Sequence, residues 1–207
     1  MYVKNFILII YIILIIYIIL LLLNKKYYWW YPSINTNLLC RGKSYPYYNN
    51  EIDIIMKEYI SKRTQDDINF FYLTDKDIII AFQDVIKEDK MKRGDMEKIL
   101  MSPKILNIIM MYKYIYNRAR PSQVAPNIIN KENGSLLDSK TAETPSYPSG
   151  HAFQAYYLAK ILSKKFPKKK EELMKIAQRI SDARIIAGLH FPSDREFAYW
   201  LVDNLLY

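Results

Sequence analysis

The stretch TPSYPSGHAFQAYYLAK, residues 144–160, holds one of only two histidines in the chain. His151 directly follows Pro148-Ser149-Gly150, and an apolar pattern with helical spacing begins behind it, so a helix is predicted to start at this turn. The first turn of a helix leaves backbone N–H groups without partners and carries partial positive charge. With the Ser149 hydroxyl and the close approach that Gly150 permits, the turn is suited to hold an anion. An isolated Ser-Gly-His is more often a plain helix cap, so the rest of the chain has to decide.

Composition narrows the class of protein. The 207 residues carry a formal net charge of +9 and are 51% hydrophobic, which suits one compact domain with an accessory segment and favours an anionic partner. Charge alone fits nucleic acid, a lipid surface or a phosphorylated small molecule equally well. Cys40 is the single cysteine, so no internal disulfide can form, and two histidines leave too few soft ligands for a usual zinc site. We therefore expect chemistry without a metal.

A membrane anchor is predicted near the amino terminus. Residues 6–23 form an unbroken run of 18 apolar residues, long enough to cross a hydrocarbon layer of about 30 Å with little tilt. Two lysines and five aromatic residues at 25–31 are typical of the head-group region. A cleaved signal peptide is the alternative, but the run does not end in the small residues that cleavage requires. Lys4 and the amino terminus nearly balance the two lysines, so the charges do not fix the orientation.

The remaining chain is predicted to form one helical domain. We assign residues 1–26 to the anchor, 27–46 to a linker of loop composition and 47–207 to the domain. Apolar residues recur at i, i+3, i+4, i+7 and i+8 from Ile52 to Ile60, which is typical of one buried helix face. Few segments alternate, so the predicted fold class is all-α, a helical bundle with an N-terminal transmembrane helix.

Further helices follow from apolar spacing and from start and stop signals. One is predicted to begin at Thr74-Asp75, with Asp77 in a weak capping box, and another to run from Pro103 until just before Pro121. Three more are predicted from the sequence at 151–165, 169–188 and 194–206, with Gly188 ending the second and Ser193 capping the third. Residues 121–148 are predicted to be a long irregular loop, which is uncommon unless it is functional.

Lys113 and Arg120 form a second candidate site for an anion. Seven residues apart on one predicted helix, they are separated by about 700°, so both cationic heads are expected on nearly the same face. A solvated basic stripe is the plainer interpretation. Arg120, however, stands at the predicted helix end beside Pro121 and leads into the long loop.

The third cluster is ARIIAGLHFPSD, residues 183–194. Arg184 lies near the end of one predicted helix, His190 on a short connector, and Asp194 in the first turn of the last helix. A carboxylate four residues from a histidine can bond one ring nitrogen, which fixes the tautomer and leaves the other nitrogen free as a nucleophile. The plainer interpretation makes Asp194 a helix-start acid and His190 a connector residue.

Together the three clusters have an order that resembles a known signature. The set Lys113-x6-Arg120-Pro121, Pro148-Ser149-Gly150-His151 and Arg184-x5-His190-x3-Asp194 is similar to that of the type 2 phosphatidic acid phosphatase (PAP2) superfamily, which includes class A acid phosphatases and vanadium haloperoxidases. The resemblance spans residues 113–194 and is closest in character to the class A acid phosphatases. Ala183 stands where the family usually has serine, and Ala198 where members commonly have glycine.

The resemblance implies a helical domain of the acid phosphatase type and a metal-independent hydrolysis of phosphate monoesters. His190 would attack phosphorus to give a phosphohistidine, Asp194 would orient its ring, and His151 would protonate the leaving oxygen. The phosphoryl oxygens would be held by Lys113, Arg120, Ser149, Gly150 and Arg184.

The implied substrate is a lipid phosphate, such as phosphatidic acid, or a soluble phosphomonoester. No cofactor and no nucleic-acid partner is expected, and the predicted location is a membrane, through residues 6–23. Two alternatives stay open. One is a vanadium-dependent haloperoxidase that holds vanadate through His190. The other is an inactive phosphate-binding module tethered to a membrane, which the alanine at 183 keeps under consideration.

Overall fold

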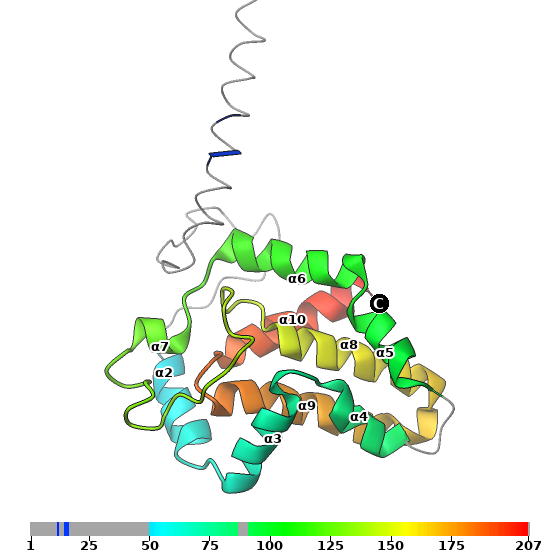
Figure 1. Cartoon of the computed structure of the whole chain (residues 1–207), viewed down its shortest axis with the longest axis horizontal. Coiled ribbons are helices and arrows are strands. Elements are labelled where there is room, and N and C mark those ends of the chain that lie inside the picture. The colour runs from blue at the N-terminus through cyan, green and yellow to red at the C-terminus, as the bar shows by residue number, and fades with distance from the viewer. Residues whose placement is uncertain (1–11, 13–14, 17–49, 87–90, 207) are drawn as a thin grey trace, which may run out of the picture.

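The computed structural model describes residues 12, 15–16, 50–86 and 91–206, and within these ranges all regular structure is helical (Figure 1). This agrees with the predicted all-α class. The predicted linker and the start of the domain near residue 47 lie outside the described residues. Of the predicted anchor only Ile12, Ile15 and Ile16 are described, and they are helical and exposed. In the ranges that the structure describes, no helix has both the length and the apolar character that a bilayer span requires.

Helices α8 (Gly150–Lys165) and α9 (Lys170–Ile186) form the centre of the domain. They run side by side, joined by a 3₁₀ turn η2 (Pro167–Lys169), and α10 (Pro192–Leu205) packs against α8 (Figure 1). The helices that surround them are α2 (Glu51–Ile54), the π-helical η1 (Ile55–Ile60), α3 (Gln65–Asp75), α4 (Ile79–Ile86), α5 (Arg93–Leu100), α6 (Pro103–Tyr116) and α7 (Pro121–Val124).

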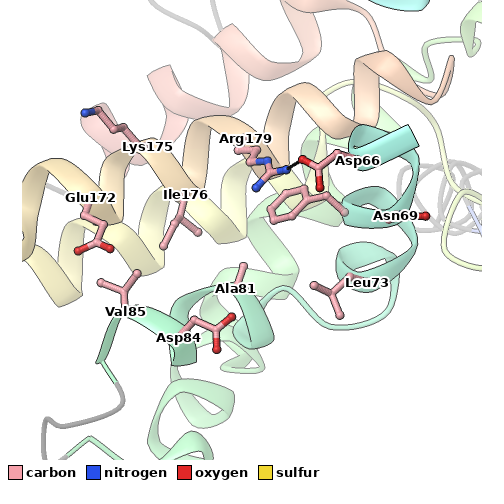
Figure 2. A pocket seen from close by; sticks show the side chains of 11 residues that line it. Asp66, Asn69, Leu73, Ala81, Asp84, Val85, Glu172, Lys175, Ile176 and Arg179 are labelled. Carbon is pink, nitrogen blue, oxygen red and sulfur yellow. Dashed lines mark hydrogen bonds and ion pairs between the residues drawn. The ribbon is translucent and has the colours of Figure 1, made fainter. Parts of the chain in front are cut away.

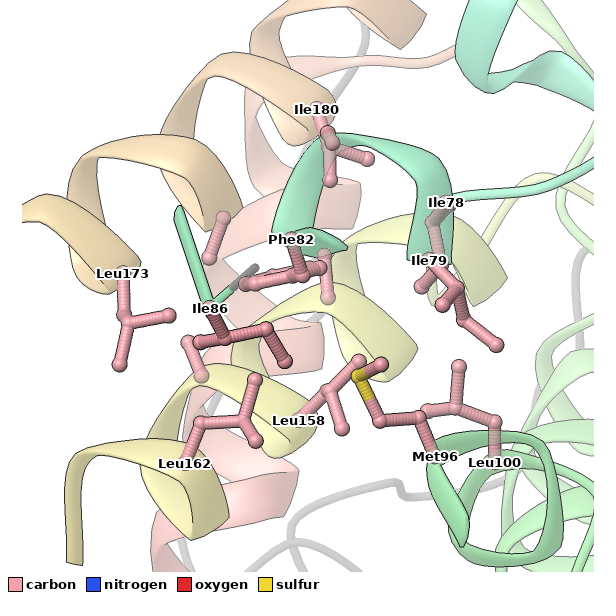
Figure 3. Packing of buried hydrophobic residues seen from close by; sticks show 14 residues of the cluster. Ile78, Ile79, Phe82, Ile86, Met96, Leu100, Leu158, Leu162, Leu173 and Ile180 are labelled. Carbon is pink, nitrogen blue, oxygen red and sulfur yellow. The ribbon is translucent and has the colours of Figure 1, made fainter. Parts of the chain in front are cut away.

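The largest apolar cluster lies among α4, α5, α8 and α9 (Figure 3). Phe82, Met96, Leu158, Leu173 and Ile180 are all fully buried there. Burial of each such side chain contributes about 1.5–3 kcal/mol relative to exposure, which makes this cluster the main support of the central pair.

A second, aromatic cluster supports the turn before α8. The rings of Tyr147 and Phe197 are stacked with their centres 4.3 Å apart, and Tyr116 meets Tyr147 edge-on at 4.9 Å. Tyr147 immediately precedes the Pro148-Ser149-Gly150 turn, so these ring contacts join the end of α6 and the second turn of α10 to the start of α8.

The predicted helix start at Thr74-Asp75 is wrong, because these two residues end α3. Helix α3 was not predicted; it begins with a capping box in which Thr64 and Asp67 bond reciprocally. Asp77 still marks the next helix start, since its Oδ1 accepts a hydrogen bond from the Ile79 N–H at 3.0 Å.

Two further helix boundaries differ from the prediction. Helix α6 ends at Tyr116, where Asn117 adopts a left-handed conformation with φ 43°, so Arg120 does not share a helix with Lys113. Helix α10 begins at Pro192, with Phe191 as its cap residue, so the predicted cap at Ser193 is also wrong. Asp194 accepts the Phe191 N–H instead, at 2.9 Å.

Candidate active site

Four parts of the chain meet around one cavity of about 220 Å³. Helix α6, residues 120–144 between α6 and α8, the start of α8, and the segment from the end of α9 to its connector all contribute to its lining. Six of the eight predicted site residues line it: Lys113, Arg120, Gly150, His151, Arg184 and His190. The other two, Ser149 and Asp194, are buried beside these residues.

His190 is held by Asp194 in a single orientation. Its Nδ1 lies 2.9 Å from Asp194 Oδ2, and both side chains are buried. A carboxylate accepts here, so Nδ1 carries the proton and Nε2 keeps its lone pair. Nε2 lies 3.3 Å from Arg120 Nη1, on the cavity side. The predicted contact between His190 and Asp194 is therefore present, and the connector brings the other ring nitrogen, Nε2, to the cavity.

Arg120 reaches the cavity from an extended segment rather than from the predicted helix. Its guanidinium is fixed by backbone carbonyls: Nη1 donates to Leu189 O at 2.9 Å, and Nε and Nη2 donate to Thr144 O at 3.0 and 2.8 Å. Anchoring by neutral acceptors leaves the positive charge available to an anion. The expected convergence with Lys113 is therefore present, although the one-helix geometry is not.

Lys113 is buried on the inner face of α6, where its Nζ donates to the Pro145 carbonyl. Burial, followed by the positive charge of Arg120, holds the pKa of Lys113 well below its ordinary value. A bound anion would add the opposite charge and raise this pKa again.

His151 faces the cavity from the first turn of α8. Its Nε2 donates to the backbone carbonyl of Asp75 at 2.8 Å, because a carbonyl can only accept. Burial and the charge of Arg184 lower the pKa of His151 to about 3. The ring is therefore neutral at physiological pH, and Nδ1 is the nitrogen that can accept a proton.

Asp75 is a site residue that the sequence reasoning missed. Its carboxylate accepts from Arg184 Nη1 at 2.6 Å and from Ser139 and Thr141 hydroxyls at 2.7 and 2.9 Å, while its carbonyl holds His151. Burial alone would raise the pKa of Asp75, but the hydrogen bonds from Ser139 and Arg184 outweigh it and lower the pKa to about 2. Asp75, the last residue of α3, thus positions both Arg184, a predicted phosphate ligand, and His151, the predicted general acid.

The Ser149-Gly150 turn has a divided role. The Ser149 side chain caps the helix by accepting the Ala152 N–H at 3.4 Å, and it does not line the cavity. Gly150 does line it, and a Cβ added there would lie 3.7 Å from the Ile109 side chain and 3.8 Å from the Lys113 side chain. The helix start therefore lies at the cavity, while the hydroxyl serves the helix, and the binding of an anion by its backbone N–H groups stays a prediction.

The two alanines at positions where the family has other residues are buried in apolar surroundings. Ala183 packs in a cluster with Phe71, Ala187 and Leu189, and it does not line the cavity. Ala198 lies in the aromatic cluster with Phe197.

A larger hollow of about 630 Å³ lies elsewhere, between α3, α4 and α9 (Figure 2). Its acidic and basic side chains partly neutralise one another, as Arg179 pairs with Asp66 and also covers the Phe70 ring at 4.0 Å. Neither histidine lines this hollow. The charge and the titratable groups converge at the smaller cavity, which is therefore the candidate active site.

A comparison with protein-family models agrees with the geometry. The family model described as the PAP2 superfamily matches residues 99–201, a range that contains all eight predicted site residues. One similar solved structure is the crystal structure of the first transmembrane PAP2 type phosphatidylglycerolphosphate phosphatase from Bacillus subtilis. It is 19% identical, with a TM-score of 0.46, over 82% of this chain and 83% of that chain. No curated protein matches the chain.

Proposed function

We propose that this chain, which belongs to the PAP2 superfamily through residues 99–201, is a phosphatase that hydrolyses phosphate monoesters through a phosphohistidine intermediate. The observation that carries the proposal is the meeting of three cations and both histidines around one cavity. Three cationic side chains line it and no carboxylate does so among the described residues, which favours an anionic ligand.

Binding would use the three cations as a clamp. Arg120 and Arg184 present guanidinium groups at the cavity whose remaining N–H donors can bond phosphoryl oxygens, and Lys113 adds a compact charge. The backbone N–H groups at Gly150 complete the cradle. Because phosphoryl transfer gains most from positioning and from stabilised charge, this fixed set would supply much of the catalysis.

In the first chemical step, His190 Nε2 attacks phosphorus and the bond to the leaving oxygen breaks. Asp194 supports the positive charge that the ring acquires. The bound dianion raises the pKa of His151, which then gives a proton to the leaving oxygen from Nδ1, since Nε2 is held by the Asp75 carbonyl.

In the second step, His151 Nδ1 takes a proton from a water molecule, and the resulting hydroxide attacks the phosphoryl group. The N–P bond breaks, inorganic phosphate leaves and His190 returns to its neutral form. Leu106, Ile109 and Met110 of α6 also line the cavity, so an apolar surface is available for the organic part of the substrate. This surface fits the acyl glycerol of a lipid phosphate and also the alkyl or aryl part of a soluble monoester.

The test is turnover by the full chain, in detergent micelles and with a chelator present, on phosphatidic acid and on an aryl phosphate. We expect hydrolysis of at least one of them, and we expect His190→Ala to lower kcat by about 10³-fold or more at unchanged thermal stability. A strict requirement for a metal ion, or full activity in His190→Ala, would contradict the proposal. Halide oxidation that depends on added vanadate would favour the haloperoxidase instead.

A further inference from the structure

A second arginine, Arg118, lies within the Lys113–Arg120 motif but does not line the cavity. The side chain of Arg118 is fully buried, and its Nη1 donates to Asp194 Oδ1 at 2.6 Å and to Ser193 Oγ at 2.7 Å. His190 uses the other carboxylate oxygen, Oδ2. Asp194 therefore contacts Arg118 through Oδ1 and the predicted nucleophile, His190, through Oδ2.

Glu51 pairs with the other terminal nitrogen of Arg118, Nη2. Arg118 Nη2 donates to Glu51 Oε2 at 2.6 Å, and the backbone N–H and the hydroxyl of Ser193 donate to the same carboxylate at 2.9 and 2.8 Å. The Glu51 side chain is only 11% exposed. Glu51 is the first residue of α2 and lies outside the region that the family model matches.

The charges along this chain of contacts do not cancel. Arg118 and Asp194 alone would form a neutral pair, and the ring of His190 would then meet little net negative charge when it becomes positive. Glu51 adds a second carboxylate, so the three ionised side chains together carry one net negative charge. In a buried setting, a net charge of this kind acts strongly on a neighbouring titratable group.

Four basic groups that face His190 act against this negative charge and lower the pKa of the ring. Arg120 follows α6, Lys113 lies on α6, Arg184 on α9 and His151 on α8, and each of them lowers the pKa of His190 after burial has done so. Asp194 on α10 contributes the carboxylate that contacts the ring, and Glu51 on α2 supplies charge to it through Arg118.

We propose that Arg118 and Glu51 are positioning residues for the nucleophile, which fix Asp194 and keep a net negative charge behind His190. This inference rests on the proposed phosphatase function. The packing of α2 against the domain would then affect the active site, because α2 carries the negative charge of Glu51.

The test compares Glu51→Gln with Asp53→Asn in the full chain. Gln keeps the shape of the side chain and removes the charge, while Asp53 is an exposed carboxylate on the same helix. We expect Glu51→Gln to lower kcat on the order of tenfold, which corresponds to about 1.4 kcal/mol, with little change in KM. The acid limb of its kcat/KM profile moves to lower pH, because the loss of a negative charge lowers the pKa of His190. Asp53→Asn leaves kcat and the profile unchanged.

A second readout does not depend on turnover. The chain has two histidines, so the proton on His190 Nδ1 can be followed by NMR and assigned with His151→Asn. We expect this proton to move upfield in Glu51→Gln, because Arg118 then draws Asp194 away from the ring. Ser193→Ala removes one bond to Glu51 and should cause a smaller shift in the same direction, and it serves as the test if Glu51→Gln does not fold.

Identical kinetics and an identical Nδ1 proton in Glu51→Gln and Asp53→Asn would overturn the positioning role. If the unaltered chain hydrolyses no phosphomonoester, the proposed function fails on that result. The NMR signal then decides the positioning role separately.

Discussion

Lys113 is the residue whose charge depends most directly on whether the site is filled. Its pKa lies well below the ordinary value, first because of burial and then because of Arg120. A phosphate anion reverses the second effect, so binding should draw a proton from solution. The same holds for His151, whose pKa is also lowered.

We therefore predict net proton uptake when inorganic phosphate binds at neutral pH. Calorimetry in buffers of different ionisation enthalpy measures the number of protons taken up. Lys113→Met should reduce the uptake by up to about one proton and weaken binding. Lys104→Met changes an exposed lysine of the same helix and should alter neither. Equal uptake in Lys113→Met and the unaltered chain would contradict this assignment.

For single residues, the sequence predicts correctly which members of the three motifs lie close to the cavity. The resemblance carried by the ordered motifs implies that Lys113, His151, Arg184 and His190 converge, and the structure places all four on one cavity. Asp75 and Glu51 could not be predicted, because each meets its arginine from a distant helix and neither belongs to a periodic or spaced pattern. Arg118 lies inside a motif but has the same type as its neighbour Arg120, so composition gave no reason to separate their roles.

The connector between α9 and α10 is the element that places His190, and it depends on Gly188. Gly188 has φ +74°, and a Cβ there would lie 2.8 Å from the Ser135 carbonyl oxygen. The sequence predicts this glycine as the end of a helix, and the structure adds the close backbone approach that no other residue permits.

Gly188→Ala should therefore destabilise the domain by about 2–4 kcal/mol, since both the backbone conformation and the contact become strained. Denaturant unfolding measures the loss. Gly94→Ala is the matched control, because a Cβ on Gly94 in α5 meets nothing within 4 Å. That variant should be unchanged or more stable by up to about 1 kcal/mol. Similar stability of the two variants would show that the turn accepts a side chain.

Helix existence was easier to predict than helix boundaries. The helices at 151–165, 169–188 and 194–206 correspond to α8, α9 and α10, because their apolar spacing is regular and each has a clear start or stop. Helix α3 escaped prediction since its start rests on a polar capping box, Thr64 with Asp67, and not on an apolar stripe. Helix α6 ends at Tyr116 because Asn117 adopts a left-handed conformation. The prediction placed the end just before Pro121, since proline was the clearer stop signal in the sequence.

For the whole molecule, the predicted anchor would place the helical domain at a membrane surface. An 18-residue apolar run followed by lysines and aromatic residues should hold the chain in a bilayer. We predict that the full chain stays with membranes after alkaline carbonate extraction, while a variant without residues 1–26 is released. Release of both to the same extent would refute the anchor and leave the phosphatase proposal untouched.

The central claim is that His190 carries the phosphoryl group during turnover. Rapid acid-free quenching of the full chain with ³²P-labelled substrate tests it directly, because phosphohistidine survives alkali and is lost in acid. With an aryl phosphate, whose leaving oxygen needs little protonation by His151, we predict alkali-stable label on the peptide that contains His190, more of it in His151→Ala, where hydrolysis of the intermediate is slowed, and none in His190→Ala. Label on another residue, or turnover by the unaltered chain with no labelled intermediate and no effect of His190→Ala, would contradict it.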